Sequence, residues 1–381
     1  MTIRPLRLGM AGGGPGSFIG PVHRMAAALD GRFALVAGAF SRSLEKSRER
    51  GLGWGIAEER IYTTPAEMFA AEKGRADGIE AVAITTPNAS HRDIAVAALR
   101  AGIPVISDKP MTATLEEAED LAKVVAETRV PFALTYTYTG YAMLREARAR
   151  VAAGAVGAVR KVVAEYPQGW LIDAIESTNA QASWRTDPAL AGAGGAIGDI
   201  GVHAFQMIEY VTGLRTTALC ADLSRIVPGR MLDDDCNILL RFGASVPGVL
   251  MASQVSTGER NGVRIRVYGE RGGLEWTHEV PDQLVVREPD NALRILHAGA
   301  PGLSDAATAA TRLPPGHPEG LIEAFATLYA DFADAVSGRA EGVLDGRLPG
   351  ITDGLRGMRF IDLAVKSSDA RRWIDFEGAM L

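Results

Sequence analysis

The chain is poor in cysteine and has no excess of positive charge. Its 381 residues include only two cysteines, Cys220 and Cys236. Two cysteines are too few for a disulfide framework or a zinc site, so we expect both to be reduced core residues. The net charge of −6 provides no basic stripe for phosphate groups, and we therefore expect neither nucleic acid nor membrane partners.

Long apolar runs are also missing. No stretch reaches the length of a membrane span, and residues 1–7 lack the uninterrupted apolar stretch of a secretion signal. Hydrophobic residues make up 47% of the chain and charged residues 23%, as in ordinary folded proteins. We expect a cytoplasmic globular protein of two domains that binds a small molecule, because 381 residues exceed the size of most single cores.

The first part of the chain alternates short apolar strands with helices. This alternation predicts an α/β fold with a doubly wound parallel sheet, and we assign residues 1–139 to a dinucleotide-binding Rossmann domain. The expected strands are Leu6–Ala11, Ala34–Phe40, Ala81–Thr85, Val105–Ser107 and Phe132–Tyr136, and the expected helices lie near 20–29, 43–50, 65–72, 90–101 and 115–127.

After about residue 140 the pattern changes to consecutive strands joined by turns. This pattern predicts an α+β domain with an open, mainly antiparallel sheet over residues 140–381. A helix at 319–337 carries an apolar stripe that includes Phe325, and we expect it to pack into this second domain. The segment 297–318 is interpreted as a surface excursion. The expected strands follow a helix at 141–153 and lie at 158–166, 217–227, 235–243, 247–256, 262–269 and 273–277.

A glycine-rich loop follows the first expected strand and precedes a helix. The N-terminus of that helix is suited to a pyrophosphate. Gly12 and Gly14 fit the first two positions of the G-x-G-x-x-G pattern, but Ser17 occupies the third and Gly20 comes three positions late. A tight structural loop is the alternative, and the position directly after the first strand favours nucleotide binding.

The end of the second strand bears on the choice of dinucleotide. An acidic residue there accepts a hydrogen bond from the 2′-hydroxyl of NAD, whereas this chain has Ser41 and Arg42. These two residues suit the 2′-phosphate of NADP. Arg42 is equally consistent with stacking on adenine or with a solvated position.

An acid/base set is predicted from Lys109, Asp199 and His203. Lys109 follows a strand and so lies at the carboxyl edge of the sheet, where α/β proteins bind ligands. Asp199 and His203 are four residues apart, so on a helix they share a face where the carboxylate can orient the imidazole. Hydride transfer to or from nicotinamide needs such groups for the alcohol proton. A surface lysine and a satisfied core histidine are the alternatives.

Two further segments are considered as binding sites, one for a sugar and one for a metal ion. Trp184 and Arg185 suit the wall of a sugar site, because an indole stacks on a pyranose and a guanidinium donates to several hydroxyls. Packing with a surface salt bridge is the alternative. Asp233-Asp234-Asp235 lacks histidine partners and is interpreted as a solvated turn, so no metal site is expected.

Four ordered motifs resemble those of the Gfo/Idh/MocA oxidoreductase family over nearly the whole chain. They are Gly20-Pro21-Val22-His23, Thr86-Pro87-Asn88-Ala89-Ser90-His91, Asp108-Lys109-Pro110 and the run from Gly194 to His203. The family usually has glutamate before the lysine, so Asp108 departs from its pattern. Asp108 and the long glycine loop together make the chain resemble a subgroup of the family that acts on inositols, levoglucosan and glycosides. The segments 138–141, 166–170, 184–188 and 316–320 also look similar to that subgroup.

The resemblance implies a Rossmann domain followed by an α/β domain with an open sheet, assembled into homodimers or homotetramers. It implies that Lys109 contacts the nicotinamide ribose and the substrate hydroxyl, that His203 acts on this hydroxyl, and that Asp199 orients His203 or binds substrate. It favours NAD, against the indication of Ser41 and Arg42, and we expect NAD with NADP as the alternative. For Asn88 and His91, a helix cap and a solvated first-turn residue are the alternatives.

The expected site residues fall into two sets. Those expected to bind the cofactor are Gly12, Gly14, Ser17, Phe18, Ile19, Ser41, Arg42, Thr86, Pro87, Asn88, His91, Asp108, Lys109, Trp184 and Arg185. Those expected to bind substrate are Lys109, Tyr166, Gln168, Arg185, Asp199, His203 and His317.

These observations predict an NAD(P)-dependent dehydrogenase that oxidises a secondary hydroxyl of a cyclic polyol or pyranose, such as scyllo-inositol, a sugar or an anhydrosugar, to a ketone. One alternative is a glycosidase that uses NAD for transient oxidation, which retained cofactor without net NADH production would reveal. The other is a nucleotide-binding regulator without turnover, against which Lys109, Asp199 and His203 together argue.

Overall fold

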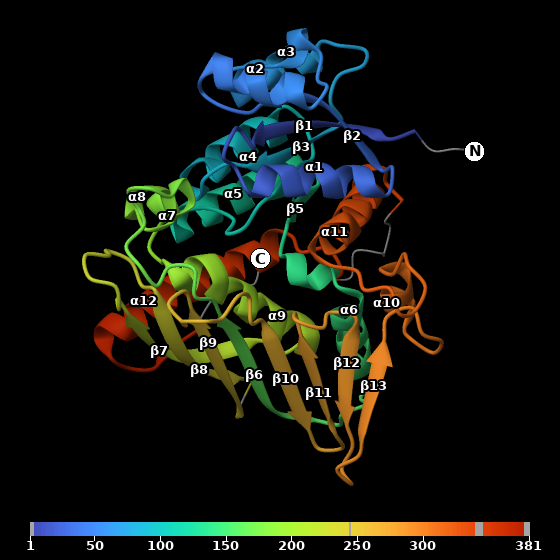
Figure 1. Ribbon diagram of the computed structural model, residues 1–381, viewed down its shortest axis with the longest axis vertical. Helices are drawn as coiled ribbons and strands as arrows, with labels where there is room; N and C mark the ends of the chain where they lie inside the picture. The colour runs from blue at the N-terminus through green and yellow to red at the C-terminus, as the bar shows by residue number, and fades with distance from the viewer. Residues whose placement is uncertain (1–3, 244, 340–345, 377–381) are drawn as a thin grey trace. The chain divides into compact units, whose positions relative to one another are not determined.

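The computed structural model describes residues 4–243, 245–339 and 346–376, and these form two compact units. The first contains described residues within Met1–Thr137 and Leu321–Leu355. The second contains those within Tyr138–Gly320 and Arg356–Leu381. Each unit has a sheet of its own, as Figure 1 shows.

The sheet of the first unit is parallel throughout and confirms the predicted Rossmann architecture. Its strand order is β2-β1-β3-β4-β5, and β3 is buried along its whole length, as expected for a sheet covered on both faces. The strand order reverses between β1 and β3, the point at which open α/β sheets bind ligands. The strands are β1 (Leu6–Gly12), β2 (Phe33–Ala39), β3 (Ala81–Thr85), β4 (Val105–Ser107) and β5 (Phe132–Leu134).

Helices connect these strands. Two of them, α3 and α5, begin with capping boxes in which Thr64 and Thr114 accept from the backbone amides of Glu67 and Glu117. The elements are α1 (Ile19–Leu29), α2 (Leu44–Gly53), η1 (Glu58–Arg60), α3 (Pro65–Lys73), η2 (Asn88–Ser90), α4 (His91–Arg100) and α5 (Leu115–Thr128).

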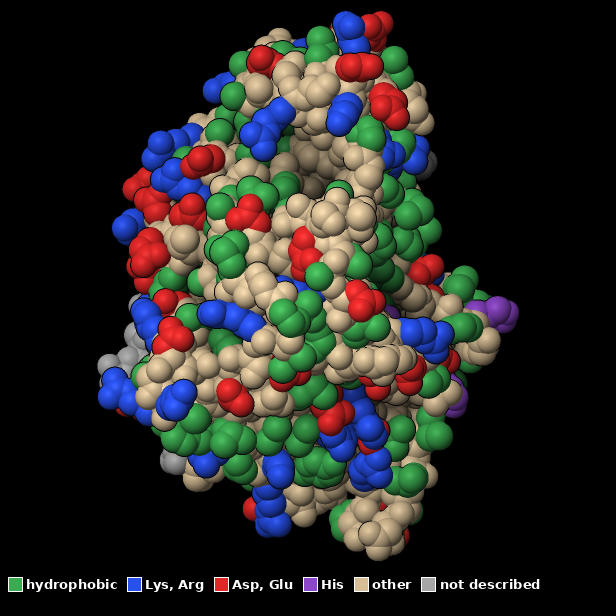
Figure 2. Space-filling view, turned by 60° about the vertical axis from the view of Figure 1, so that its left-hand side comes forward, with side chains coloured by type: hydrophobic (Ala, Val, Ile, Leu, Met, Phe, Trp, Pro, Cys, Tyr) green, Lys and Arg blue, Asp and Glu red, His purple; other side chains and the backbone are tan. Residues whose placement is uncertain are grey.

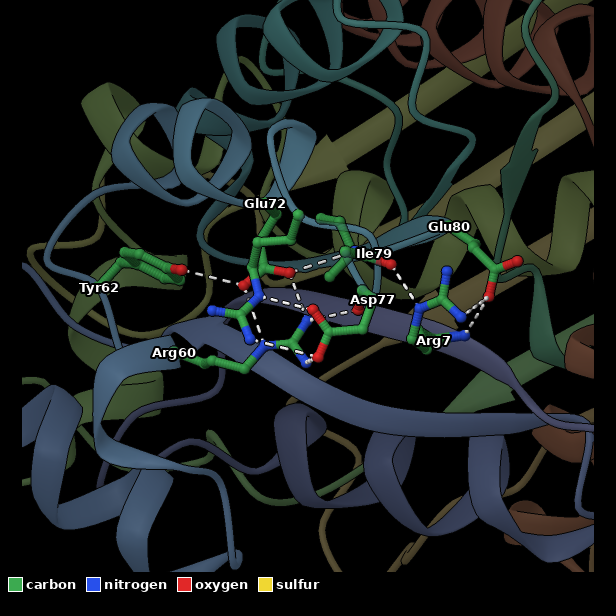
Figure 3. A network of polar contacts seen from close by, with 9 residues as sticks. Arg7, Arg60, Tyr62, Glu72, Asp77, Ile79 and Glu80 are labelled. Atoms are coloured by element: carbon green, nitrogen blue, oxygen red, sulfur yellow. Dashed lines mark hydrogen bonds and ion pairs between the residues drawn. The ribbon is translucent and has the colours of Figure 1, made fainter.

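A buried ion pair ties α3 to the loops beside it. The Glu72 carboxylate accepts from the Arg60 guanidinium, from Tyr62 Oη at 2.9 Å and from the Ile79 amide at 3.2 Å (Figure 3). Burial and then the bond to Glu72 raise the pKa of Tyr62 to about 12. These donors compensate the buried negative charge, which unpaired would be costly.

Helix α11 (Leu321–Val336) belongs to the first unit although it lies far along the chain. Its residues Phe325, Tyr329 and Phe332 share a hydrophobic core with α1 and β1, and α1 and α11 lie side by side in Figure 1. Phe332 stacks on Phe33 with ring centroids 5.8 Å apart. The expectation that this helix packs into the second domain is therefore wrong. An apolar stripe predicts burial but does not identify the partner sheet.

The second unit is built on a nine-stranded sheet of order β13-β12-β11-β10-β6-β9-β8-β7-β14. All neighbouring pairs are antiparallel except β6 and β9, which confirms the mainly antiparallel sheet. The sequence did not indicate β12, β13 or β14. The strands are β6 (Val159–Pro167), β7 (Thr216–Ser224), β8 (Asp235–Phe242), β9 (Val246–Ser253), β10 (Arg264–Gly269), β11 (Gly273–Thr277), β12 (Gln283–Arg287), β13 (Leu293–His297) and β14 (Ile374–Asp375).

One face of this sheet is covered by α6 and α9 (Figure 1). The alternation along β8 shows the consequence, since Cys236 and Ile238 are buried whereas Asn237 and Leu239 are exposed. Both cysteines are free thiols, with Cys220 half-buried. The helical elements of this part are η3 (Thr137–Gly140), α6 (Ala142–Ala152), α7 (Ala180–Arg185), α8 (Pro188–Ala191), the π-helical turn η4 (Ile197–Gly201), α9 (Val202–Thr212), α10 (Asp305–Ala309) and α12 (Ile351–Ala370).

The surface agrees with the composition. Basic and acidic side chains are interspersed over the face drawn in Figure 2. Within the described ranges, no helix combines the length and the apolar character needed to cross a membrane.

Candidate active site

The glycine loop lies at the carboxyl end of β1 and leaves no space for side chains at several positions. A Cβ on Gly12, whose φ is +93°, would lie 2.7 Å from the Thr85 carbonyl carbon. A Cβ on Gly14 would lie 2.7 Å from the Phe40 carbonyl oxygen. A Cβ on Gly20 would collide with Gly13 Cα, so Gly20 allows the close approach of helix and strand that the third glycine of the pattern normally permits.

The extra residues of the loop form a turn before α1. The Ser17 amide donates to the Gly14 carbonyl at 3.0 Å, and Ser17 Oγ accepts from the Gly20 amide at 3.2 Å. Phe18 is 58% exposed, and Ile19 opens α1. Backbone without Cβ atoms in front of a helix N-terminus fits a dinucleotide pyrophosphate, so the irregular spacing does not count against cofactor binding.

Two arginines, one after β2 and one in α2, are candidates to contact a cofactor at the glycine loop. Arg42 is exposed beyond β2, while Ser41 Oγ accepts from the Ser43 amide at 3.2 Å. Arg50 of α2 donates to the Gly14 carbonyl at 3.0 Å and lies 4.9 Å from the Trp54 ring centroid. The sequence did not single out Arg50, because a basic residue in the last turn of a helix has no distinguishing pattern.

The loop after β3 continues the same edge of the sheet. His91 is buried, with Nε2 2.7 Å from the Thr86 carbonyl oxygen and Nδ1 2.9 Å from that of Pro110. Burial lowers the pKa of His91 below its ordinary value. Asn88 is also buried, and Ser90 precedes α4 without capping it through its side chain. The solvated alternative for His91 is therefore wrong, and the ring joins this loop to the segment that carries Lys109.

Asp108 and Lys109 directly follow β4. The Asp108 amide donates to the Ile84 carbonyl at 2.9 Å, and its Oδ1 accepts from Thr135 Oγ1 at 2.8 Å. Burial alone raises the pKa of the Asp108 carboxyl, but the His23 imidazole, the Lys109 ammonium and the Thr135 hydroxyl together hold it below its ordinary value. Lys109 thus stands beside a carboxylate at the carboxyl edge of the parallel sheet.

In the second unit, Asp199 lies in the π-helical turn and His203 in the first turn of α9. Such π-helical turns are rare and occur frequently at functional sites. Both oxygens of Asp233 fix the start of this segment, since they accept from the Gly195 and Ile197 amides at 2.7 Å each. Burial raises the pKa of Asp233 to about 6.

The acidic run 233–235 is therefore not a solvated turn. Asp233 and Asp234 are 8% and 1% exposed. Asp234 accepts from the Ile226 and Val227 amides at 2.7 and 3.0 Å and from Arg230 at 3.0 Å. The prediction was wrong because the sequence does not reveal backbone donors contributed by other segments. Within the described ranges, no group of His, Cys, Asp and Glu side chains is arranged to hold a metal ion.

The Asp199 carboxylate receives two side chains from distant parts of the second unit. Its Oδ2 accepts from Arg185 Nε at 3.1 Å and from Gln254 Nε2 at 2.9 Å. The Arg185 guanidinium lies 4.2 Å from the Trp184 ring centroid and 5.9 Å from that of Trp170. The salt bridge that the sequence posed as the alternative is thus present, and the Arg185 guanidinium also packs against both indole rings. Gln254, which is 3% exposed, was not anticipated.

A polar aromatic cluster surrounds His203. Tyr138 donates to Tyr166 across 2.6 Å between hydroxyl oxygens, and the Tyr138 and His203 ring centroids are 5.2 Å apart. Burial raises the pKa of both tyrosines, so they act as neutral hydroxyls. Asn261 contacts this cluster at Tyr138 Oη, at 3.4 Å, and also accepts from Gln168 at 2.7 Å.

His278 extends the cluster, with Nε2 2.9 Å from Tyr141 Oη and Nδ1 3.1 Å from Asn261 Nδ2. Burial lowers its pKa. Neither Asn261 nor His278 stands in a recognisable motif, so sequence reasoning missed both. His317 is exposed, and its Nδ1 lies 3.2 Å from the Pro314 carbonyl of its own loop.

A parallel sheet with reversed strand order and a glycine cradle at its switch point define a dinucleotide-binding α/β protein. Residues 6–136 match the oxidoreductase family with an NAD-binding Rossmann fold, and residues 144–275 match the GFO/IDH/MocA C-terminal domain. The chain is 34% identical to the uncharacterized oxidoreductase YfiI of Bacillus subtilis, with 98% of each protein covered. The chain therefore belongs to the GFO/IDH/MocA oxidoreductase family.

Two other relatives extend the comparison. A crystal structure of an inositol dehydrogenase homologue from Azotobacter vinelandii, complexed with NAD+, matches with a TM-score of 0.94 and 37% identity. The match covers 98% of this chain and 97% of that one. Levoglucosan dehydrogenase of Pseudarthrobacter phenanthrenivorans is 27% identical over 97% of this chain and 98% of its own length.

Proposed function

We propose that the protein is an NAD-dependent dehydrogenase that oxidises a secondary hydroxyl of a cyclic polyol or pyranose to a ketone. The observation that carries this proposal is the position of Lys109, which follows β4 on the same carboxyl edge as the glycine loop after β1. Open α/β sheets bind their ligands at that edge, so a basic side chain there can accept the proton of a substrate alcohol.

The residues of each unit have distinct roles in this proposal. Bound NAD supplies the nicotinamide ring that accepts the hydride. Lys109 would accept the proton of the substrate hydroxyl. For His203, the resemblance to the family implies a hydrogen bond to the substrate. Asp199, fixed by Arg185 and Gln254, lies in the turn before the helix that carries His203, and it orients His203 or binds substrate. Neutral Tyr138 and Tyr166 pack around His203 and exclude water from it.

The side chains near Asp199 support this substrate class. Trp184 and Trp170 offer apolar faces for a ring, while Arg185, Gln168 and Tyr166 offer donors and acceptors for its hydroxyls. Relatives support a ring substrate of this kind. The Azotobacter vinelandii homologue has been crystallised with NADH and myo-inositol, and a levoglucosan dehydrogenase with NADH and levoglucosan.

For the cofactor, we infer NAD rather than NADP. Gly12, Gly14, Ser17, Phe18 and Ile19 would hold the pyrophosphate and the segment 86–91 the nicotinamide side, with Asp108 beside Lys109. The NAD+ and NADH complexes of the structural relatives support this choice, and the cation at the end of β2, Arg42, is exposed. The predictions of a homodimer or homotetramer and of a cytoplasmic location stay predictions.

A panel of inositols, aldoses and anhydrosugars tests the function, with formation of reduced cofactor followed by absorbance. We expect NADH to accumulate with at least one cyclic polyol or pyranose. Release of product from a glycoside with bound cofactor and no net NADH would instead indicate the transient-oxidation glycosidase. Tight binding of NAD with no turnover of any panel member would indicate the regulator and overturn the proposal.

A further inference from the structure

Within the first unit, two buried polar side chains lead to the half-buried carboxylate of Asp108, the residue before Lys109. His23, from the fifth position of α1, is fully buried, and its Nδ1 lies 2.8 Å from Tyr329 Oη on α11. Its Nε2 lies 3.9 Å from Asp108 Oδ1, which also accepts from Thr135. The order of contacts is thus Tyr329, His23, Asp108, with Lys109 next to Asp108 in the chain.

The hydrogen positions follow from the partners. Nε2 faces a carboxylate oxygen, which can only accept, so we assign the ring proton to Nε2 and let Nδ1 accept from the Tyr329 hydroxyl. That N–H then faces the Asp108 carboxylate. In the described part of the chain, Nε2 of His23 has no other hydrogen-bond partner, and 3.9 Å is longer than a formed hydrogen bond. A fully buried donor directed at a carboxylate that is only 16% exposed is difficult to explain by packing alone.

The packing around the ring restricts it to this orientation. The His23 ring meets Phe325 edge-on, with centroids 5.1 Å apart, and Tyr329 at 5.8 Å. Helix α11 therefore contributes both the hydroxyl that donates to Nδ1 and the aromatic edge that fixes the ring plane. This gives α11 a reason to pack on the Rossmann sheet beyond burial of its apolar stripe.

We propose that His23, oriented by Tyr329, is a positioning residue that shares the negative charge of Asp108 and thereby sets the proton affinity of Lys109. An anion beside an ammonium favours the charged amine. A donor that takes up part of the Asp108 charge weakens this effect, so Lys109 exchanges its proton at lower pH. The consequence of this charge sharing for catalysis rests on the proposed role of Lys109 as the group that receives the alcohol proton, whereas the charge sharing itself does not.

Two further groups interact with the Asp108 carboxylate, and both must be the same in every variant that is compared. His91 on the α4 side interacts electrostatically with both Asp108 and Lys109, and its own pKa is lowered by burial. Thr135 donates from the end of β5. The variants that test His23 therefore leave Asp108, His91 and Thr135 unchanged.

The test is a titration of Lys109 in the full-length protein by NMR with lysine labelled at Cε. The chain has only six lysines, and the spectrum of Lys109→Arg assigns the signal. We expect the Lys109 midpoint to rise by about 1 pH unit in His23→Leu and by about half a unit in Tyr329→Phe. His23→Gln, which keeps an amide donor, should return the midpoint toward the wild-type value.

The matched control is Tyr62→Phe, which removes a hydroxyl from another buried carboxylate, Glu72, in the same unit. It should leave the Lys109 midpoint unchanged. An unchanged midpoint in both Tyr329→Phe and His23→Leu, with thermal unfolding showing folded proteins, overturns the inference. Equal shifts in Tyr62→Phe and Tyr329→Phe overturn it as well, since the effect would then be structural.

This titration needs no substrate, so its outcome is independent of the proposed function. A shifted midpoint without dehydrogenase activity would uphold the His23 inference and reject the function. Where turnover is found, the acid limb of the kcat profile should move to higher pH in the same variants, while KM for NAD stays constant.

Discussion

The two units hold their functional residues in different ways. In the first unit, the glycine loop, the segment 86–91 and Lys109 follow successive strands of one parallel sheet, so their placement is a property of the backbone. In the second unit, Asp199 and His203 sit at the start of a helix that is fixed by side chains from elsewhere. Asp233 binds the backbone, and Arg185 and Gln254 bind the carboxylate.

This difference has consequences for robustness. A strand end tolerates changes in its side chains provided the sheet is intact, whereas a helix start held by three distant side chains depends on each of them. A substitution near His203 should therefore disturb the position of His203 more than an equally distant substitution near Lys109 disturbs the position of Lys109. The predictions below probe this contrast.

The largest effects are expected for Lys109→Ala and His203→Ala. Each should lose on the order of 10²–10⁴-fold in kcat while still binding NAD, because general acid/base contributions have this size. Steady-state kinetics and cofactor titration measure both quantities. The exposed residues Lys123 and His297 supply controls, and their alanine variants should keep full turnover. Near-wild-type kcat in Lys109→Ala or His203→Ala would remove that residue from the mechanism.

The contrast also explains what the sequence could and could not predict. Periodicity placed the Rossmann strands to within about two residues, because parallel strands buried on both faces are continuous apolar runs. Motif spacing selected Lys109, Asp199 and His203. It gave no sign of Gln254, Asn261 or His278, since each acts through a partner far away in the chain, such as Gln254 with Asp199.

The G-x-G-x-x-G pattern predicts its third glycine at position 17, which is Ser17 in this chain. In the structure Gly20 has the packing role of that glycine. The longer loop causes this shift, and a rule based on spacing alone does not predict it. Strand β13 was missed because burial does not follow its apolar residues, since Leu293 and Ile295 are both exposed. Asp233 was predicted to be solvated because its neighbours in the sequence are polar, but its side chain is buried in the structure.

Phe325→Ala tests the assignment of α11 to the first unit. Removing a ring that is 2% exposed should cost about 3–5 kcal/mol, the range of large-to-small core substitutions. Hydrogen exchange should show the loss of protection in β1 and α1. Phe18→Ala, at a 58% exposed site of the same unit, is the control and should leave stability unchanged. Loss of protection confined to the nine-stranded sheet would contradict the packing described.

Asp233→Ala tests the side-chain anchoring of the second unit. Two buried amides, those of Gly195 and Ile197, lose their acceptors, at about 1–3 kcal/mol each. Urea unfolding measures the loss, and kcat should fall with it because the turn that carries Asp199 and His203 is released. Asp235→Ala, two positions along at a half-buried site, is the control. Unchanged kcat in a measurably destabilised Asp233→Ala would show that the turn holds its shape without Asp233.

The same residue gives a pH dependence of stability. Because burial raises the pKa of Asp233 to about 6, the native state binds this proton more tightly than the unfolded chain does. The contribution of Asp233 to stability is therefore greatest at low pH and declines as the pH rises through about 4 to 6. In Asp233→Ala this decline should be absent, so the difference in unfolding free energy from the wild type should shrink as the pH rises.

The smallest effect is expected at the ribose end of the cofactor site. With NAD, Arg42→Ala should change kcat/KM by less than about threefold, because an exposed side chain contributes little to a neutral ribose. With NADP, the same substitution should reduce kcat/KM by about tenfold, since a charge-assisted hydrogen bond from Arg42 to the 2′-phosphate would be lost.

Arg50→Ala separates the two arginines near the glycine loop. Its guanidinium donates to the Gly14 carbonyl, so its loss should weaken binding of NAD and NADP equally. Measuring kcat/KM for both cofactors in wild type and both variants decides between backbone support and phosphate recognition. A wild-type preference for NADP that collapses in Arg42→Ala would show that the cation at the end of β2 selects the cofactor. Both units would then depend on a side-chain contact for specificity, and the contrast between them would not extend to cofactor choice.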